Sequence, residues 1–445
     1  MDLQSFIYVG KFYKKFLEST LKPYNYIKGQ DGFNMSMCKI KNNNCIFSIR
    51  ILSTIEGYFG EKIIPGNYSN MSLDFIQKML KKRKEEDPTY NTNVQIGKNF
   101  MWNNWTNILI DNTIFFVGKI ENDSIIINQN IKPAVLFNKK IITKEDHKKN
   151  YMFSDVRIFK KNNILYFYDG MISSIYTIII KNNTINLSND NILKEKMFSK
   201  NFVCAADQNY NNQYVNKYDK NWALIDIIND EEFGKSFEFL NWYDNESSYV
   251  TTTIVQMNGN KCKKNNFIKM KKDLIPIYGS ELLPMFSFGT PFIKFKINYK
   301  KKNKGIIYDG ISVGHTKIRS TKEYTDGKLN LFISFVRNKF KNLKYIEHNS
   351  YMYLIYFIRL TKYNNGKNIL KISDSFLYTN NDNDKYKFSI QFPMGIILLN
   401  NFLYVSCGEG DYYNILLKFK ISDIKKVCKH NVHTFQEKLY DCHLI

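Results

Sequence analysis

The chain has 445 residues, enough for one large domain or two to three ordinary ones, and it contains 44% hydrophobic and 16% aromatic residues. This composition excludes a disordered chain, because so much apolar surface can form a core. The formal net charge of +23, from 64 Lys and Arg against 41 Asp and Glu, favours an anionic partner such as nucleic acid, an acidic lipid surface, a phosphorylated sugar or an acidic glycan. The basic residues are spread along the whole chain and form no nucleic-acid-binding motif.

Short motifs exclude several other classes of protein. The seven cysteines include no C-x-x-C pair, and no Cys/His spacing resembles a zinc site, so we expect no metal and no cofactor. Gly-rich phosphate loops, the Rossmann fingerprint, G-x-S-x-G and H-E-x-x-H are all missing. No signal peptide and no membrane span are predicted. We therefore expect a cytoplasmic or virion-associated protein, and the oligomeric state stays open.

The predicted elements begin with an N-terminal extension, residues 1–32, that is helical or irregular. A hairpin follows at 33–51, with alternating strands around an Asn-rich turn. Residues 72–86, SLDFIQKMLKKRKEE, predict an inserted helix with a Ser cap and one apolar face. Alternation then predicts strands at 108–120 and 124–131.

Further hairpins of the same kind recur along the chain. They begin near residues 153, 218, 288 and 392, and the strand candidates between them cover 175–187, 237–242, 249–257, 329–336 and 351–360. Five units with roughly four strands each predict an all-β, five-bladed β-propeller over residues 33–420, with a few peripheral helices. A β-sandwich is the alternative, since it shows similar alternation. Residues 421–445 form a C-terminal tail with a short helix after Ser422.

Four segments of the chain resemble five-bladed β-propeller carbohydrate enzymes, above all the mannoside phosphorylase and mannosidase family, and also β-mannosyltransferases and giant-virus relatives. The first is Asp155-Val156-Arg157, which resembles a Glu-Asp-Pro-Arg segment, with Ser154 in place of the Glu and Val156 in place of the Pro. The others are Lys220-Asn221-Trp222 after Asp219, Gly289-Thr290-Pro291 with Gly314-His315-Thr316-Lys317, and Phe392-Pro393 with Gly408-Glu409-Gly410-Asp411. In the first unit, Met35 replaces the usual Pro.

The resemblance implies a sugar site at the centre of the ring, where the innermost strands of the blades begin. Asp155 would be the catalytic acid or would accept a sugar hydroxyl. The implied substrate-binding residues are Asn34, Arg50, Arg157, Asp219, Lys220, Asn221, Trp222, Thr290, His315, Lys317, Glu409 and Asp411. Lys, Arg and His would neutralise a phosphate, either as the attacking group or in a sugar-nucleotide donor.

Each of these residues also has a structural interpretation. Asp155 and Arg157 can cap a strand or pair with each other, and a lysine such as Lys220 at a strand start is commonly solvated. Trp222 fits a hydrophobic core as well as a sugar platform, and His315 fits a structural role. Glu409 and Asp411 could belong to a Gly-rich turn.

Three functions remain in competition. The first is an enzyme that makes or breaks glycosidic bonds, as a phosphorylase or glycosyltransferase rather than a two-carboxylate hydrolase, with a glycan or sugar phosphate as partner. The second is a non-catalytic glycan-binding or structural propeller, such as a virion component. The third is nucleic-acid binding through the basic surface, which has no motif in its favour.

Overall fold

Paired asparagines make the tight turns on which the fold is built. Asn162 and Asn163 have φ of 48° and 65°, and Asn400 and Asn401 have φ of 47° and 65°. Two consecutive residues with positive φ form the hairpin turn whose twist matches that of the flanking strands, and Asn tolerates this conformation. The Asn pairs therefore fix where neighbouring strands of a blade reverse direction.

We describe the fold from a computed structural model. The described residues are 6–8, 33–54, 109–121, 124–137, 155–168, 175–188, 192, 202–204, 221–242, 249–259, 261–269, 285–298, 302, 304–319, 351–373, 391–409, 413–428, 430–434 and 440–444. The helix predicted at 72–86 and the strand predicted at 329–336 lie outside these residues.

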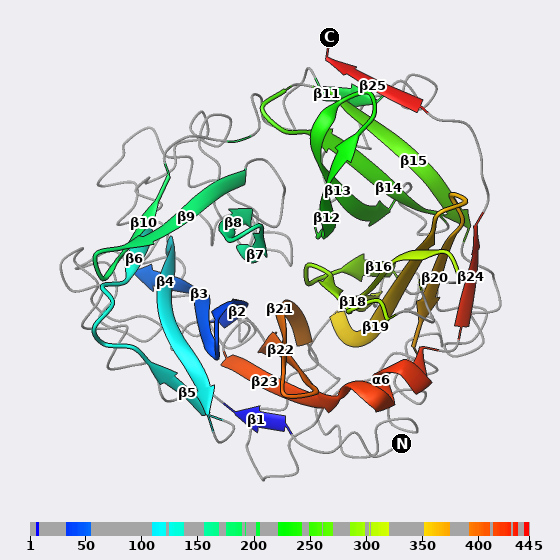
Figure 1. The fold of residues 1–445 in the computed structure, drawn as a ribbon. Coiled ribbons are helices and arrows are strands. Elements are labelled where there is room, and N and C mark those ends of the chain that lie inside the picture. Colours follow the sequence, from blue (N-terminus) through cyan, green and yellow to red (C-terminus); the bar gives the residue numbers. More distant parts are fainter. Residues whose placement is uncertain are drawn as a thin grey trace, which may run out of the picture.

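The strands form five blades arranged in a ring (Figure 1). Blade 1 contains β2 (Phe33–Lys41), β3 (Asn44–Thr54), β4 (Leu109–Glu121), β5 (Ser124–Ile127) and β6 (Ala134–Phe137). Blade 2 contains β7 (Arg157–Lys161), β8 (Ile164–Tyr168), β9 (Ile175–Lys181) and β10 (Thr184–Leu187). Blade 3 contains β12 (Ala223–Asp230), β13 (Gly234–Trp242), β14 (Tyr249–Gln256) and β15 (Cys262–Lys269).

The last two blades are less regular. Blade 4 contains β16 (Met285–Phe288), β17 (Ile293–Lys294), β18 (Ile306–Arg319), β19 (Tyr351–Tyr363) and β20 (Asn368–Ile372), and both β16 and β17 pair with β18. Blade 5 contains β21 (Gln391–Leu399), β22 (Phe402–Glu409) and β23 (Tyr413–Lys420). The five-bladed propeller predicted from the sequence is confirmed, and the sandwich alternative is wrong.

Both ends of the chain add strands to the ring. β1 (Phe6–Tyr8) pairs with β23 and completes blade 5 as its fourth strand. After the short helix α6 (Ile421–Val427), β24 (His430–Thr434) pairs with both β15 and β20 and joins blades 3 and 4 into one sheet. β25 (Tyr440–Leu444) pairs with β11 (Phe202–Cys204) and β15. The terminal segments, predicted as a helical or irregular extension and a tail, thus supply strands.

The hydrophobic core is divided among the five junctions between neighbouring blades. Five clusters of buried residues each join two adjacent blades, and the cluster between blades 1 and 5 includes Met35, Met37 and Leu416. Successive residues of one strand enter different clusters, as Phe116 and Val117 do, because the two faces of a blade contact different neighbours. Cys38, Cys45, Cys262, Cys407 and Cys428 are free thiols. Within the described part of the chain, no helix is long and apolar enough to span a membrane.

We expect removal of residues 1–8 to lower the melting temperature, because it takes β1 away from β23 and leaves the outer edge of blade 5 without its partner strand. The exposed edge should also make the protein more prone to aggregation at high concentration. Differential scanning calorimetry and light scattering measure the two effects. A chain that begins at Phe6 is the control, and equal melting temperatures for both truncations would contradict the role of β1.

Candidate functional site

The innermost strands of blades 1 to 3 are each entered through a residue in the left-handed backbone region. Asn34, Asp155 and Asn221 have φ of 51°, 59° and 82°. Asn and Asp visit this region more readily than other residues with a Cβ, because their short polar side chains bond locally. The three residues are buried, and they belong to three different blades. This repeated backbone turn is what delivers polar side chains to the hub.

Asp155 connects blade 2 to blade 1. Its Oδ1 accepts a hydrogen bond of 2.6 Å from Nδ2 of Asn34. The same atom forms an ion pair with Nη1 of Arg50 at 3.0 Å. The side chains of Arg50 and Asp155 keep 20% and 10% of their surface exposed. An ionised carboxylate only accepts hydrogen bonds, and both of these partners donate. The pair is therefore an anchored carboxylate beside a partly accessible guanidinium.

Arg157 connects blade 2 to blades 3, 4 and 5. Its side chain is completely buried, its Nε donates to the carbonyl of Gly289, and its Nη2 donates to Oδ1 of Asn221 at 2.9 Å. Nη1 lies 3.4 Å from the carbonyl of Asp155, and Cζ lies 5.8 Å from the ring centroid of Phe392. These acceptors and the aromatic face offset the cost of removing the guanidinium from water. The location makes Arg157 a positioning residue rather than a group exposed to a ligand.

The surroundings of Trp222 are those of a core residue. The indole packs edge to face on Phe239 in the cluster between blades 2 and 3, and it is 7% exposed. The hydroxyl of Tyr168 donates to the carbonyl of Trp222 at 3.2 Å. Burial raises the pKa of Tyr168 to about 12, although Arg157 and the backbone N–H of Leu224 act in the opposite direction. Tyr168 is therefore a neutral hydrogen-bond donor at neutral pH.

His315 belongs to an aromatic group on the blade 4 side of the hub. Its ring stacks on Tyr353 with centroids 5.0 Å apart and meets the edge of Phe392 at 4.8 Å. His315 is fully buried, and Phe392 is the same ring that Arg157 contacts. The structure thus brings His315 close to the Arg157 network through Phe392.

Thr290 serves the internal structure of blade 4. Its Oγ1 accepts the backbone N–H of Val313 at 3.0 Å and lies 3.2 Å from the hydroxyl of Ser312. Thr290 is fully buried and lies between β16 and β17, so these bonds hold that connection against β18. Its hydroxyl is therefore engaged with the neighbouring strand β18.

Of five other predicted site residues, three lie outside the described residues and two are described by their backbone alone. Asp219, Lys220 and Asp411 lie outside the described residues. Lys317 and Glu409 are placed by backbone alone: Lys317 pairs with Met285 and Tyr353, and Glu409 pairs with Gln391 and Tyr413. The predicted residues that the structure does bring together are Asn34, Arg50, Asp155, Arg157 and Asn221.

Three residues that the sequence analysis placed in motifs, but did not name as site residues, also contribute to the hub. The carbonyl of Gly289 accepts from Arg157, the ring of Phe392 lies against both Arg157 and His315, and Gly408 borders Asn34. A Cβ at Gly408 would lie 1.8 Å from Oδ1 of Asn34, so only glycine fits there without displacing that amide. The aromatic residue at the start of unit five was a usable signal for Phe392. A backbone carbonyl leaves no signal in the sequence.

The described strand starts present charged side chains of both signs. Among the described residues, no group of three or more His, Cys, Asp or Glu side chains could hold a metal ion. Of the side chains that the structure describes at the strand starts, Asp155 is the carboxylate, and Arg50 and Arg157 are the cations. Of these groups, the carboxylate of Asp155 and the guanidinium of Arg50 are partly exposed, and such a pair fits recognition of hydroxyl and phosphate oxygens.

Comparison with known proteins finds likeness in structure but not in sequence. No family profile matches the chain, and no curated protein matches it. A β-1,2-mannobiose phosphorylase from Listeria innocua is similar at 12% identity and a TM-score of 0.43, over 89% of this chain and 91% of that one. A mannose phosphorylase from Leishmania mexicana, in complex with phosphate ion, shows 7% identity and a TM-score of 0.37 over 96% and 98%. A GDP-Man-dependent mannosyltransferase from the same organism shows 8% identity and a TM-score of 0.37, over 94% of this chain and 89% of that one.

We expect Arg157→Met to lower the free energy of unfolding by roughly 2–6 kcal/mol, because each buried acceptor left without its donor costs about 1–3 kcal/mol. The substitution leaves the acceptors on Gly289 and Asn221 without their donor. Arg157→Lys should be intermediate, because one ammonium cannot reach the same acceptors as a planar guanidinium. Urea unfolding followed by tryptophan fluorescence measures the change.

Lys181→Met is the control, because Lys181 is an exposed residue at the β9–β10 turn and should change stability by less than about 0.5 kcal/mol. An Arg157→Met protein as stable as this control would show that the hub network is dispensable.

Proposed function

We propose that this propeller acts on carbohydrate at the end of the hub where the innermost strands begin, making or breaking glycosidic bonds. The observation that carries the proposal is the meeting of Asn34, Arg50, Asp155 and Asn221 from three blades, with Arg50 and Asp155 still partly exposed. Sugars are bound by side-chain amides, carboxylates and guanidinium groups that converge on their hydroxyls.

Two buried amide atoms support a hydroxyl-rich ligand. Oδ1 of Asn34 and Nδ2 of Asn221 have no hydrogen-bond partner among the residues that the structure describes. A buried polar atom without a partner is costly, so such atoms in a native site call for a ligand or water. One is an acceptor and the other a donor, and a sugar hydroxyl can serve either of them. Both atoms are closed to solvent here, so such a hydroxyl would reach them only after the surrounding side chains shift.

The charge balance favours a phosphate or sugar-nucleotide partner over hydrolysis by two carboxylates. A two-carboxylate glycosidase needs an acid and a base or nucleophile on opposite sides of the scissile bond. Asp155 is the carboxylate among the described side chains at the strand starts, and it is held beside Arg50. In phosphorolysis, a phosphate oxygen bonds to the anomeric carbon while the glycosidic bond breaks and the departing oxygen gains a proton. Arg50 is placed to neutralise that phosphate, and Arg157 holds the site in shape.

Asp155 suits the role of sugar-hydroxyl acceptor better than that of proton donor. Its Oδ1 already accepts from Asn34 and Arg50, an arrangement that favours the ionised carboxylate. As an acceptor, Asp155 would orient the sugar ring relative to the phosphate. The departing oxygen would then take its proton by way of a sugar hydroxyl or from solvent.

A second candidate, a non-catalytic glycan-binding or structural propeller, has one observation in its favour. Arg157, His315 and Phe392 are buried and packed on one another at the hub, so these groups act on their neighbours in the protein. A protein that only holds its shape or adheres to glycans has no need of a reactive group at this place.

We expect incubation with a panel of mannosides and mannose donors, with and without inorganic phosphate, to yield product with at least one donor. Asp155→Asn should lower the rate by about 100-fold or more, because it removes the charge that orients the substrate while keeping the size of the side chain. Chromatography of the products measures both.

Asp230→Asn is the matched control, because Asp230 is also about one-tenth exposed and pairs with Lys263 at 2.8 Å, far from the strand starts. It should retain the parent rate. Parent rates in Asp155→Asn would contradict the enzymatic proposal. No product from any donor, combined with binding to a glycan array that Asp155→Asn abolishes, would replace it with the non-catalytic alternative.

A further inference from the structure

Three innermost strands end in lysine at the face of the ring opposite the strand starts. β2 ends with Lys39 and Lys41, β7 ends with Lys160 and Lys161, and Lys294 ends β17. Lys296 follows two residues later, and the residue between them, Phe295, is buried while both lysines are exposed. Because the innermost strands of a propeller run side by side through the hub, these ends lie at the same hairpin face.

The lysines are distributed over successive junctions between blades. Lys39 continues the face of β2 that packs Met35 and Met37 against blade 5. Lys160 donates to the carbonyl of Ile40 and so lies between blades 2 and 1. Lys161 forms an ion pair with Asp226 of blade 3. The cations thus follow the circumference of the hub and do not form a single cluster.

Blade 3 supplies the carboxylates that hold part of this ring in place. Asp226 pairs with Lys161 and lies 3.9 Å from Nζ of Lys294, so it links blades 2, 3 and 4. Its cross-strand neighbour Glu238 pairs with Lys362 of blade 4. The β12–β13 hairpin adds three more acids, Asp230, Glu231 and Glu232, to these two. The five acids face eight lysines, because Lys362 and Lys263 add to the six named above, and Lys263 pairs with Asp230 and Glu232. The hairpin face of the hub therefore keeps an excess of positive charge.

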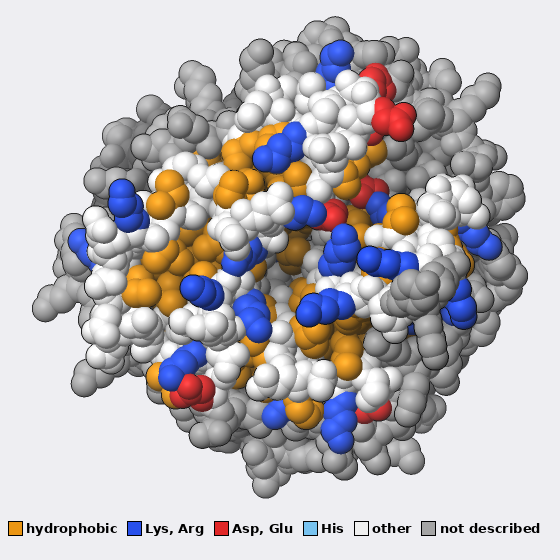
Figure 2. Space-filling model, viewed as in Figure 1, with side chains coloured by type: hydrophobic (Ala, Val, Ile, Leu, Met, Phe, Trp, Pro, Cys, Tyr) orange, Lys and Arg blue, Asp and Glu red, His pale blue; other side chains and the backbone are white. Residues whose placement is uncertain are grey.

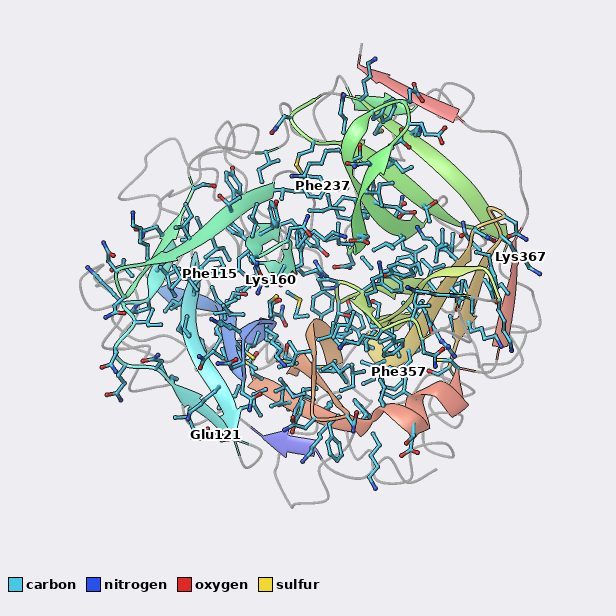
Figure 3. All side chains as sticks on the ribbon, in the orientation of Figure 1. Phe115, Glu121, Lys160, Phe237, Phe357 and Lys367 are labelled. Atoms are coloured by element: carbon cyan, nitrogen blue, oxygen red, sulfur yellow. The ribbon has the colours of Figure 1, made fainter. Side chains whose placement is uncertain are left out.

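The surface view shows the consequence. Lys and Arg side chains surround a hollow at the middle of the ring, and hydrophobic side chains lie inside it (Figure 2). Lys160 lies near the middle of the same view, whereas Lys367 lies at the rim (Figure 3). Positive charge around a concave opening concentrates the field there and favours a compact ligand of high negative charge.

We propose that this hairpin face binds a small anion carrying several phosphate groups, at a site separate from the sugar site. The site, called here the lysine ring, consists of Lys39, Lys41, Lys160, Lys161, Lys294 and Lys296. It lies at the opposite end of the same strands: Arg157 and Lys161 are four residues apart on β7, or roughly 13 Å. Several ammonium groups, each acting as a point charge, suit a ligand with many anionic oxygens and no fixed geometry.

The test is titration of the protein with inorganic tripolyphosphate by calorimetry at low and moderate salt. We expect saturable binding of one tripolyphosphate per chain that weakens as the salt concentration rises. The triple variant Lys39→Gln, Lys294→Gln, Lys296→Gln should bind at least tenfold more weakly. It leaves Lys160 and Lys161, whose Nζ atoms contact the carbonyl of Ile40 and the carboxylate of Asp226, and circular dichroism checks its fold.

The matched control is Lys132→Gln, Lys181→Gln, Lys367→Gln, which removes the same charge from exposed lysines on outer strands and turns. It should bind tripolyphosphate within about twofold of the parent. Equal weakening in both triple variants would show diffuse attraction to net charge and overturn the proposal, as would the lack of saturable binding at low salt. Asp155→Asn should leave tripolyphosphate binding unchanged, so this test is independent of the sugar site.

Discussion

The buried guanidinium of Arg157 is the interaction on which the rest of the hub depends. A charged group removed from water costs several kcal/mol unless it is fully hydrogen-bonded. Here the acceptors come from Asp155, Asn221 and Gly289, and Phe392 covers the face of the group. Four blades must therefore be in register before the guanidinium is satisfied. Asp155 then adds blade 1 through Asn34 and Arg50.

In this arrangement, one set of residues holds the hub together and another is accessible to a ligand. Arg157 is sealed away from solvent, while Arg50 and Asp155 keep part of their surface exposed. The buried Arg157 holds the backbone of Asp155 in place, and because it is sealed off it does not compete for the ligand. The opening at the other end of the hub is built differently, because its lysines are long and flexible and are held at only some positions, by Asp226 and by the carbonyl of Ile40.

Most of the architecture could be predicted from the sequence, because local signals agreed with it. Alternating strands around turns such as Asn162-Asn163 and Asn400-Asn401 marked the hairpins, and five such units gave the number of blades. Strand β1 has three residues, too few for any periodicity, and β24, His430–Thr434, contains a single apolar residue, so their places in the sheets left no trace. At the site, the convergence of Asn34, Asp155 and Asn221 was predictable from their places at unit starts. The carbonyl of Gly289 and the core packing of Trp222 depend on tertiary contacts that no local pattern encodes.

The pairing of β1 with β23 has a consequence for how the chain reaches its native state. Phe6 lies opposite Leu417, so the two strands that complete one blade are separated by about 400 residues of sequence. Contacts between such distant residues form slowly, because a very long loop must close first. During synthesis, blades 1 to 4 emerge before the residues of β23 exist, and β1 must wait without its partner. Final closure of the circle therefore follows the synthesis of β23, and the unclosed intermediate carries open sheet edges that are prone to misassociation until blade 5 is complete.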